Sequence, residues 1–239
     1  MKKKLVLGHG DKGGVGKSTL ISLAVDYALG KYGPVAVVEG DETIDDVARR
    51  FEGVDGVTGF MVDLSRPDRP EEAVIQLFEE LERHGLPDTV VINTPASASA
   101  TLDKQAAIFV DAAHEMGYSV RVGWMLGPDE NSAALSAQSE LCKLADLKIA
   151  ILNERFGDGK RFAWAKHPAR AAWIASGGLE AALPALTDTA CNAAREHAGR
   201  FTVLAAPGSP LTTISRRYVG DWVRKAFEGP VDMLFADGE

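Results

Sequence analysis

Short apolar runs alternate along the chain with segments whose apolar residues recur every three or four positions. The first pattern is typical of buried β-strands and the second of helices that cover a sheet. Strand-like runs occur at residues 5–9, 34–39, 57–63, 89–93, 119–126, 147–152 and 202–206. Because helical segments separate most of them, the strands are expected to be parallel and joined by crossover helices. The pattern predicts a three-layer α/β fold, with a mostly parallel central sheet and helices on both faces.

The helical segments differ in how clearly they begin and end. Periodic spacing predicts helices at residues 17–29, 45–51, 70–81, 102–113, 130–144, 168–176 and 179–198. The last of these is expected to kink at Pro184. No repeat, low-complexity stretch or linker interrupts the alternation. Residues 1–239 are therefore predicted to form a single domain.

The end of the chain predicts one further helix. Ser209 and Pro210 have the arrangement of an N-cap followed by proline at the first helical position. Its buried side is expected to carry Leu211, Ile214, Tyr218 and Trp222. Basic residues on its other side allow binding to an anionic membrane surface, although the apolar stripe suits a core and makes membrane binding the less favoured interpretation.

Composition narrows the class of protein. Hydrophobic residues make up 46% and charged residues 25% of the 239 residues, which is typical of a globular domain. The net charge of −8 argues against a protein that coats nucleic acid, but not against a local basic patch. Cys142 and Cys191 lie in helical apolar patterns without metal-ligand spacing. They are expected to be buried free thiols of a cytoplasmic protein.

Between the first strand and the first helix, residues 10–19 read Gly-Asp-Lys-Gly-Gly-Val-Gly-Lys-Ser-Thr. This is the spacing G-x-x-x-x-G-K-[ST] of a phosphate-binding loop. Glycines allow successive backbone N–H groups to point at one anion, and the helix N-terminus adds partial positive charge. We predict that Lys17 reaches the β- and γ-phosphates, that Ser18 ligates Mg²⁺ and that Thr19 binds the α-phosphate. The remaining nucleotide contacts are expected from Gly13, Gly14, Val15 and Gly16.

Lys12 gives this loop a second lysine. The string Lys-Gly-Gly-Val-Gly-Lys-Ser-Thr resembles the deviant Walker A motif of the ParA/MinD family of P-loop ATPases. The resemblance implies that Lys12 reaches the phosphates of a partner subunit, which would couple ATP binding to the formation of a homodimer. The alternative is an ordinary solvated lysine.

Two strand ends resemble the companion motifs of the family and also depart from them. Glu39-Gly40-Asp41 stands where the family has an Asp-x-Asp pattern that handles the attacking water and the metal shell, so Asp41 is expected to contribute to both. As an alternative, Asp41 could cap the next helix. At the Walker B position, Asn93 replaces the family's aspartate, which removes a negative charge from the Mg²⁺ site. The rate of hydrolysis is thus the open point.

Two further residues are expected to contact the base by this resemblance. Asn153 follows the strand at 147–152, where the family's adenine-reading asparagine lies, and Pro207 follows the expected strand at 202–206. Each could instead be an ordinary turn residue at a strand end. Residues 154–170 mix basic and aromatic side chains. This composition suits DNA or a protein partner, and equally a solvated loop whose aromatic rings are buried.

Three functional hypotheses follow. The first is an ATP- and Mg²⁺-dependent ATPase that acts as a dimer switch in plasmid or chromosome partition, conjugative transfer or cellular positioning, with DNA or a DNA-bound protein as partner. The second is a ligase or metal-insertion enzyme with a small-molecule acceptor. The third is a nucleotide-sensing binding protein with little hydrolysis. The first rests on Lys12 and Lys17 together, and the third on Asn93.

Overall fold

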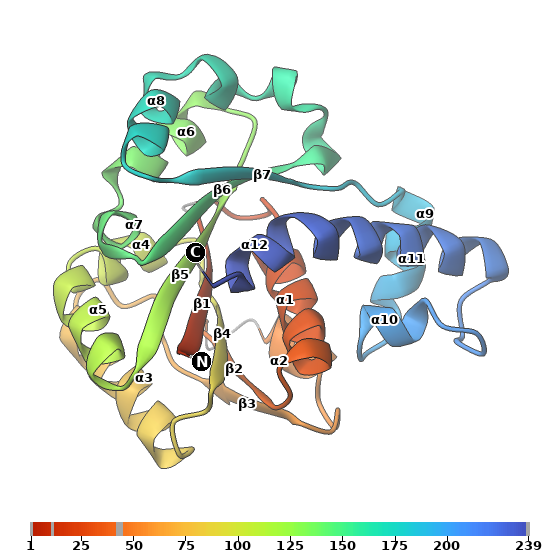
Figure 1. Ribbon diagram of the computed structural model, residues 1–239, viewed down its shortest axis with the longest axis horizontal. Helices are drawn as coiled ribbons and strands as arrows, with labels where there is room; N and C mark the ends of the chain where they lie inside the picture. Colours follow the sequence, from red (N-terminus) through yellow and green to blue (C-terminus); the bar gives the residue numbers. More distant parts are fainter. Residues whose placement is uncertain (1, 11, 42–44, 238–239) are drawn as a thin grey trace.

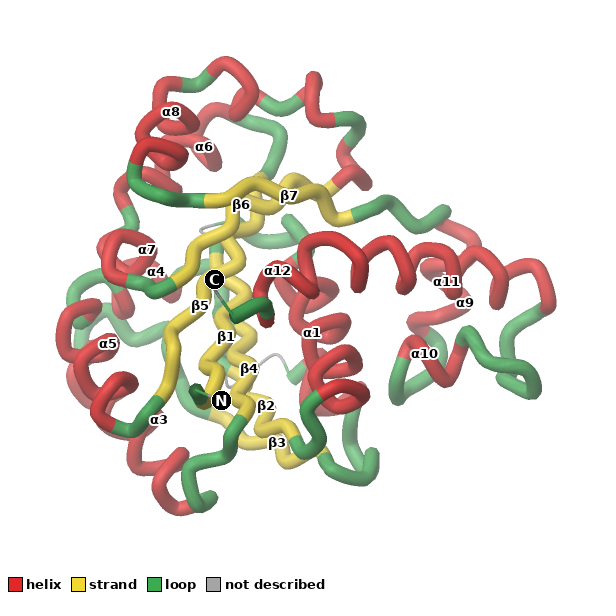
Figure 2. Tube along the Cα trace, in the orientation of Figure 1, coloured by secondary structure: helices red, strands yellow, loops and turns green. Residues whose placement is uncertain are grey.

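One seven-stranded sheet runs through the protein (Figures 1 and 2). The computed structural model describes residues 2–10, 12–41 and 45–237. The strand order is β3-β2-β4-β1-β5-β6-β7, and every neighbouring pair is parallel. The strands are β1 (Lys3–His9), β2 (Val35–Glu39), β3 (Val57–Met61), β4 (Thr89–Asn93), β5 (Tyr118–Leu126), β6 (Leu147–Asn153) and β7 (Leu179–Leu183).

Helices cover both faces of the sheet (Figure 1). One face carries α1 (Lys17–Lys31), α2 (Asp46–Arg50), α9 (Asp188–Arg195), α10 (Phe201–Leu204), α11 (Thr213–Ala226) and α12 (Asp232–Phe235). The other carries α3 (Pro70–Arg83), α4 (Ala98–Leu102), α5 (Ala106–Glu115), α6 (Glu130–Gln138), α7 (Glu140–Leu144) and α8 (Pro168–Ala175). Three 3₁₀ turns, η1 (Glu154–Phe156), η2 (Gly159–Arg161) and η3 (Ala163–Lys166), follow β6, and a wide turn, η4 (Phe227–Val231), precedes α12. The expected three-layer α/β fold is confirmed.

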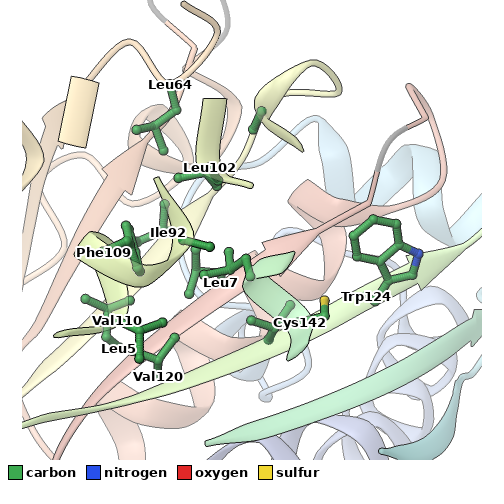
Figure 3. Packing of buried hydrophobic residues seen from close by; sticks show 14 of the residues in the cluster. Leu5, Leu7, Leu64, Ile92, Leu102, Phe109, Val110, Val120, Trp124 and Cys142 are labelled. Atoms are coloured by element: carbon green, nitrogen blue, oxygen red, sulfur yellow. The ribbon is translucent and has the colours of Figure 1, made fainter. Parts of the chain in front are cut away.

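Each face of the sheet has its own hydrophobic core. Leu5 and Leu7 on β1 point into the layer that α3 and α5 cover, whereas Val6 between them points toward α1. Figure 3 shows the first of these layers, with Ile92 and Phe109 packed against Leu7 and its neighbours. Strands buried on both faces read as continuous apolar runs, which is why the sequence predicted them well.

The stretch from residue 179 to residue 206 differs from the prediction. Leu179–Leu183 was expected to be helical, but it pairs with the exposed edge of β6 as strand β7. The apolar run at 202–206 was expected to be the last strand, but it begins as helix α10. Asp26 explains the helix, because its carboxylate accepts the backbone N–H of Thr202 at 2.8 Å and the Thr202 hydroxyl at 2.7 Å. A buried carboxylate at a helix N-terminus satisfies the free N–H groups there.

The last long helix starts later than predicted. Thr212, not Ser209, is the N-cap of α11, and its hydroxyl accepts the backbone N–H of Ser215 at 3.3 Å. The buried side of α11 is consequently rotated from the predicted one, and Ile214 and Tyr218 are 64% and 51% exposed. The residues that face the core are Ser215, Val219, Trp222, Val223 and Ala226.

None of the described helices has the length and apolar character that crossing a membrane would require.

Two predicted helices are each broken in two. The break between α6 and α7 falls at Ser139, whose hydroxyl accepts the backbone N–H of Cys142 and donates to Asp103 Oδ1 at 2.8 Å. Asp103 lies in the break between α4 and α5 and also accepts the backbone N–H of Leu141 at 2.9 Å. One carboxylate therefore joins both breaks.

Both cysteines are free, but only Cys142 is buried as predicted, whereas Cys191 is half-buried.

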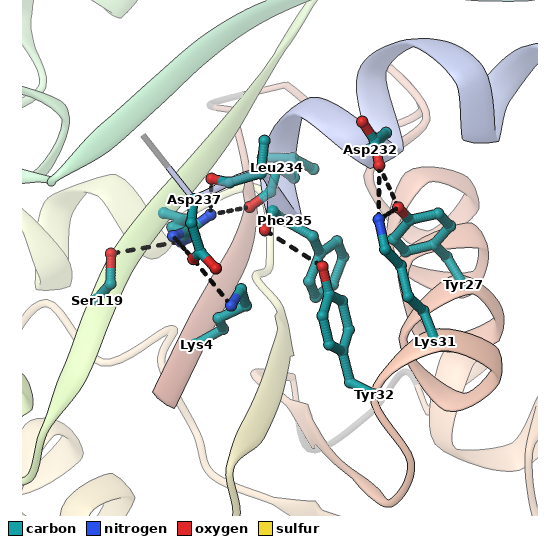
Figure 4. A network of polar contacts seen from close by, with 11 residues as sticks. Lys4, Tyr27, Lys31, Tyr32, Ser119, Asp232, Leu234, Phe235 and Asp237 are labelled. Carbon is teal, nitrogen blue, oxygen red and sulfur yellow. Dashed lines mark hydrogen bonds and ion pairs between the residues drawn. The ribbon is translucent and has the colours of Figure 1, made fainter. Parts of the chain in front are cut away.

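The end of the described chain returns to the start of the sheet (Figure 4). Asp237 lies 3.0 Å from Lys4 Nζ, and Arg121 on β5 donates to the Ala236 carbonyl at 2.6 Å. These contacts hold the end of α12 against β1 and β5, and Lys31 of α1 pairs with Asp232 of α12 at 3.0 Å, so the C-terminal helices pack in the same layer as the phosphate-loop helix.

Candidate nucleotide-phosphate site

The loop between β1 and α1 has the backbone that a phosphate site needs. Gly10, Gly14 and Gly16 have φ values of 142°, 76° and 108°, a backbone conformation that residues with a Cβ rarely adopt. Gly16 is also the N-cap residue of α1, so the free N–H groups of that helix begin where the loop ends. Asp11 lies outside the described residues, although it belongs to the predicted loop. The described part of the loop has the shape expected from its spacing.

Lys17 closes the loop on itself. Its ammonium group donates to the carbonyl oxygens of Gly10 and Lys12, both at 2.9 Å, and the residue is buried. A cavity of about 360 Å³ opens beside it, at the carboxyl ends of β1, β2 and β4. Its lining consists of Gly13, Gly14, Gly16, Lys17, Ser18, Thr19, Asp41, Asp46, Asn93, Thr94, Pro95, Ala96 and Arg195. Of the predicted contacts in the loop, the Val15 side chain is the exception, because it is buried in the core.

Asn93 and Glu39 form a buried pair beneath this cavity. The Asn93 amide donates to Glu39 Oε2 at 2.8 Å and to Ser18 Oγ at 3.3 Å. Glu39 Oε1 accepts the backbone N–H groups of Val47 and Ala48, at 2.6 and 2.8 Å, at the start of α2. Glu39 is therefore occupied by a helix N-terminus and by Asn93, and it does not line the cavity. Burial raises the pKa of Glu39, and these hydrogen bonds oppose that rise.

The same pair explains why position 93 carries an amide. An aspartate there would bring its carboxylate against Glu39, which is fully buried, and two like charges at that distance repel strongly. Asparagine donates instead. Glu39 is thus the acidic member of this buried pair, and Asn93 is its neutral hydrogen-bond donor.

The predicted metal ligands meet in the cavity. Ser18, Asp41 and Asn93 all line it. Asn93 Oδ1 is buried and has no hydrogen-bond partner in the described chain, which leaves one amide oxygen to accept from a metal-bound water. Among the described residues there is no cluster of three or more His, Cys, Asp or Glu side chains that could hold a metal by itself. This donor set fits Mg²⁺, which keeps several waters and takes few ligands from the protein.

Lys12 lies at the outer edge of the loop and contacts Asp129. The two side chains form an ion pair, with Lys12 56% exposed, and this contact lowers the pKa of Asp129. Asp129 is also the N-cap of α6, where it accepts the backbone N–H of Ser132 at 3.1 Å. The turn between β5 and α6 therefore holds the side chain of Lys12 beside the loop.

His9 was not predicted to be a site residue. It ends β1 directly beneath the loop, is fully buried, and has ring nitrogens 3.1 Å from Thr94 Oγ1 and 3.4 Å from Ser99 Oγ. Burial, with a smaller contribution from the Lys17 charge, lowers the pKa of His9 to about 3, so the ring is neutral. Its edge-on contact with the Trp124 ring, at 4.9 Å between centroids, fixes its orientation.

Asn153 and Pro207, the two residues expected to contact the base, have other positions or partners in the structure. Asn153 does end β6 as predicted, but its amide donates to the Val15 carbonyl at 2.9 Å and its oxygen accepts the Arg155 backbone N–H at 3.1 Å. It supports the phosphate loop from below and is buried. Pro207 is exposed in a turn after α10, because the strand expected before it is a helix, and it does not line the phosphate cavity.

Asp46 and Arg195 line the cavity without having been predicted. Asp46 is the first residue of α2 and follows Asp41 by five positions. Its closeness to Asp41 in the sequence is the one signal that could have indicated a second carboxylate in the site. Arg195 ends α9, and no local signal in the sequence connects it with the loop at residues 10–19.

The segment at residues 154–170 packs two of its aromatic side chains into the protein. Phe162 and Trp164 are buried, and the Trp164 indole donates to Glu180 Oε1 at 2.6 Å. Arg170 forms two hydrogen bonds with the same carboxylate. The alternative of a loop with buried aromatic rings therefore describes this segment better than an open basic and aromatic surface.

The sequence matches no protein-family model and no curated protein. Its structure is similar to that of the septum site-determining protein MinD from Pyrococcus horikoshii OT3, solved with Mg-ADP, at a TM-score of 0.53 and 18% identity, covering 94% of this chain and 95% of that chain. It is also similar to the cell division ATPase MinD of Pyrococcus furiosus, at a TM-score of 0.51 and 17% identity, covering 95% of this chain and 98% of that one. The chain has the α/β fold of a P-loop NTPase, of the kind seen in MinD.

Proposed function

We propose that this chain binds ATP and Mg²⁺ at the phosphate loop and works as a slowly hydrolysing switch that dimerises when ATP is bound. The observation that carries the proposal is the cavity beside Lys17, where loop glycines, Ser18, Asp41 and Asn93 meet. MinD-like folds support it, because one of the similar structures was solved with Mg-ADP.

The loop residues divide the work of binding. The N–H groups at the start of α1 and the Lys17 ammonium would hold the β- and γ-phosphates, and Thr19 the α-phosphate. Ser18 would ligate Mg²⁺, while Asn93 Oδ1 would accept a hydrogen bond from a metal-bound water. When bound, Mg²⁺ neutralises charge on the phosphates. Asp41 is the carboxylate in the cavity lining that would orient the attacking water.

Slow hydrolysis follows from the charges. Because Asn93 is neutral and Glu39 is held by α2, Asp41 and Asp46 supply the negative charge in the described lining. Fewer carboxylates hold the Mg²⁺ shell less strongly. If hydrolysis proves negligible, the same site remains a nucleotide sensor.

Lys12 would connect the nucleotide with the dimer. It extends from the loop and is half-exposed, with Asp129 as its partner within the chain. Exchange of this exposed ion pair for a partner subunit's phosphate replaces a weak contact by one with a multiply charged anion. Plasmid or chromosome partition, conjugative transfer and cellular positioning in the cytoplasm are the processes that such a switch would serve.

Calorimetric titration with ATP and Mg²⁺ tests binding. Lys17→Ala should weaken binding at least ~100-fold, because it removes a charge-assisted contact with two phosphates, whereas Lys166→Ala, which removes an exposed lysine outside the cavity, should not. Equal binding by wild type and Lys17→Ala would contradict the proposal.

Sedimentation with ATP, ADP or no nucleotide then tests the switch. A dimer that forms only with ATP, and is lost in Lys12→Ala, is expected. Repeating the ATP run with duplex DNA separates partition or transfer, where the dimer should bind DNA, from positioning through protein partners.

A further inference from the structure

A second cavity opens next to the phosphate site, between α1, α2 and the end of α9. Its volume is about 680 Å³, within the range of small-molecule sites. The lining consists of Ser18, Thr19, Ser22, Asp46, Arg49, Arg50, Arg195, His197, Ala198 and Phe201. Four of these residues, Ser18, Thr19, Asp46 and Arg195, also line the phosphate cavity, so the two spaces adjoin.

The lining of the second cavity is strongly basic. Arg49, Arg50 and Arg195 come from two helices that lie far apart in the sequence, and His197 follows the second of them. Asp46 is the one acidic residue in the described lining, and Arg49 lies 3.8 Å from it. Arg49 also lies 3.8 Å from Asp45, so two aspartates flank it, and the excess of positive charge in the described lining rests on Arg50 and Arg195.

Arg50 is the clearest sign of this excess. Its Nε and Nη2 atoms are buried and have no hydrogen-bond partner in the described chain, and its guanidinium lies 3.7 Å from the centre of the Phe201 ring. Burial lowers the pKa of Arg50 to about 10. The charge of the buried Asp26 opposes this lowering of the pKa, but the Asp26 carboxylate pairs with Arg200 at 2.7 Å. Arg50 Nη1 donates to the Ala194 carbonyl at 3.5 Å. A desolvated cation without an acidic partner is costly unless an anion approaches it.

We propose that this cavity binds a small phosphate-bearing molecule at the same time as nucleotide occupies the phosphate loop. Guanidinium groups match the geometry of phosphate oxygens, and three of them converge here. Because Arg195 and Asp46 line both cavities, binding in one changes the affinity of the other, and the effect is reciprocal. The ligand thus makes the nucleotide switch responsive to a phosphorylated metabolite.

The test uses glycerol 3-phosphate as probe and glycerol as the phosphate-free comparison. Thermal unfolding is followed in protein saturated with Mg-ADP and in the Lys17→Ala variant without nucleotide. Glycerol 3-phosphate should raise the Tm saturably in both, and glycerol in neither. The second arm keeps this inference separate from nucleotide binding, because Lys17 does not line the second cavity.

The variant Arg49→Gln/Arg195→Gln should bind the probe at least ~10-fold more weakly, since two charge-assisted contacts are lost. Arg50→Met keeps the packing on Phe201, and it should weaken binding in the same direction. Arg217→Gln removes an exposed positive charge outside the cavity and should leave binding unchanged. Displacement of ADP by the probe, no rise in Tm, or unchanged binding by the Arg49/Arg195 variant would each overturn the proposal.

Discussion

The Asn93–Glu39 pair makes a quantitative prediction about charge. In Asn93→Asp, the amide that donates to Glu39 Oε2 at 2.8 Å becomes a carboxylate oxygen at about the same position. Glu39 cannot turn away easily, because its other oxygen binds the N-terminus of α2. Two buried carboxylates must then either repel each other or share a proton.

Both routes cost similar free energy at pH 7. Two unit charges about 4 Å apart at an effective dielectric constant of about 20 repel by roughly 4 kcal/mol. Protonating one carboxyl at pH 7 costs about 1.4 kcal/mol for each of roughly three pH units above its ordinary pKa, again about 4 kcal/mol. Burial already raises the pKa of Glu39, so this is an upper value. At pH 5 the second route costs only about 1–2 kcal/mol.

The expected result is a variant that is about 3 kcal/mol less stable than wild type at pH 7 but only about 1–2 kcal/mol less stable at pH 5. Urea unfolding without Mg²⁺ at both pH values measures the difference.

Adding Glu39→Gln to the Asn93→Asp chain provides the matched control. The oxygen of the introduced glutamine can still accept from Val47 and Ala48, while its amide can donate to the introduced aspartate. Stability should return to within about 1 kcal/mol of wild type, as a coupled pair in a double-mutant cycle would show. The charge now lies at position 93 beside Ser18, so Mg²⁺ affinity should rise by about 10-fold. A stability loss that is the same at pH 5 and pH 7, or that the second substitution does not recover, would refute the reasoning.

Two further predictions concern the loop itself. Because burial lowers the pKa of His9 to about 3, the unfolded chain binds the extra proton as pH falls below 6.5; stability should therefore drop by about 2 kcal/mol between pH 6.5 and 5. In His9→Gln, urea unfolding should lose that part of the pH dependence, and an unchanged slope would assign it to other groups. Asp129→Asn keeps the cap of α6 but releases Lys12, so sedimentation with ATP should show a dimer up to about 5-fold tighter; a weaker dimer would mean that the pair supports the active loop.

The features that could be predicted from the sequence are those that local pattern determines. Strands buried on both faces, such as β4, show as unbroken apolar runs, and the phosphate loop depends on a fixed spacing between adjacent elements. By contrast, residues 202–206 have a strand-like sequence, and their helix depends on Asp26, a residue 176 positions away. The strand at 179–183 depends in the same way on the free edge of β6.

In the candidate site, too, residues set by local pattern were predicted and residues brought there by distant packing were not. Lys17, Ser18 and Asn93 line one cavity, as the sequence led us to expect, because each adjoins a strand or helix end that the local pattern determines. The use of the Asn153 amide was not predictable, since nothing in its own strand indicates that the Val15 carbonyl lies beside it. Arg195 was not predicted for the same reason, because only the packing of α9 in the layer of α1 brings it to the loop.

The charges of the site also suggest how a switch would be held at rest. Lys17 donates to two loop carbonyls and already lines the cavity, whereas Glu39 is bound to the start of α2 outside the lining. Lys12 differs, because its ion pair with Asp129 must open before the lysine can reach a second molecule. In the proposed switch, pairing of two subunits would therefore require the opening of this ion pair in addition to nucleotide binding. If the chain works as the proposed switch, Asp129 is therefore expected to control the pairing of subunits, and Asn93 the rate of hydrolysis that ends it.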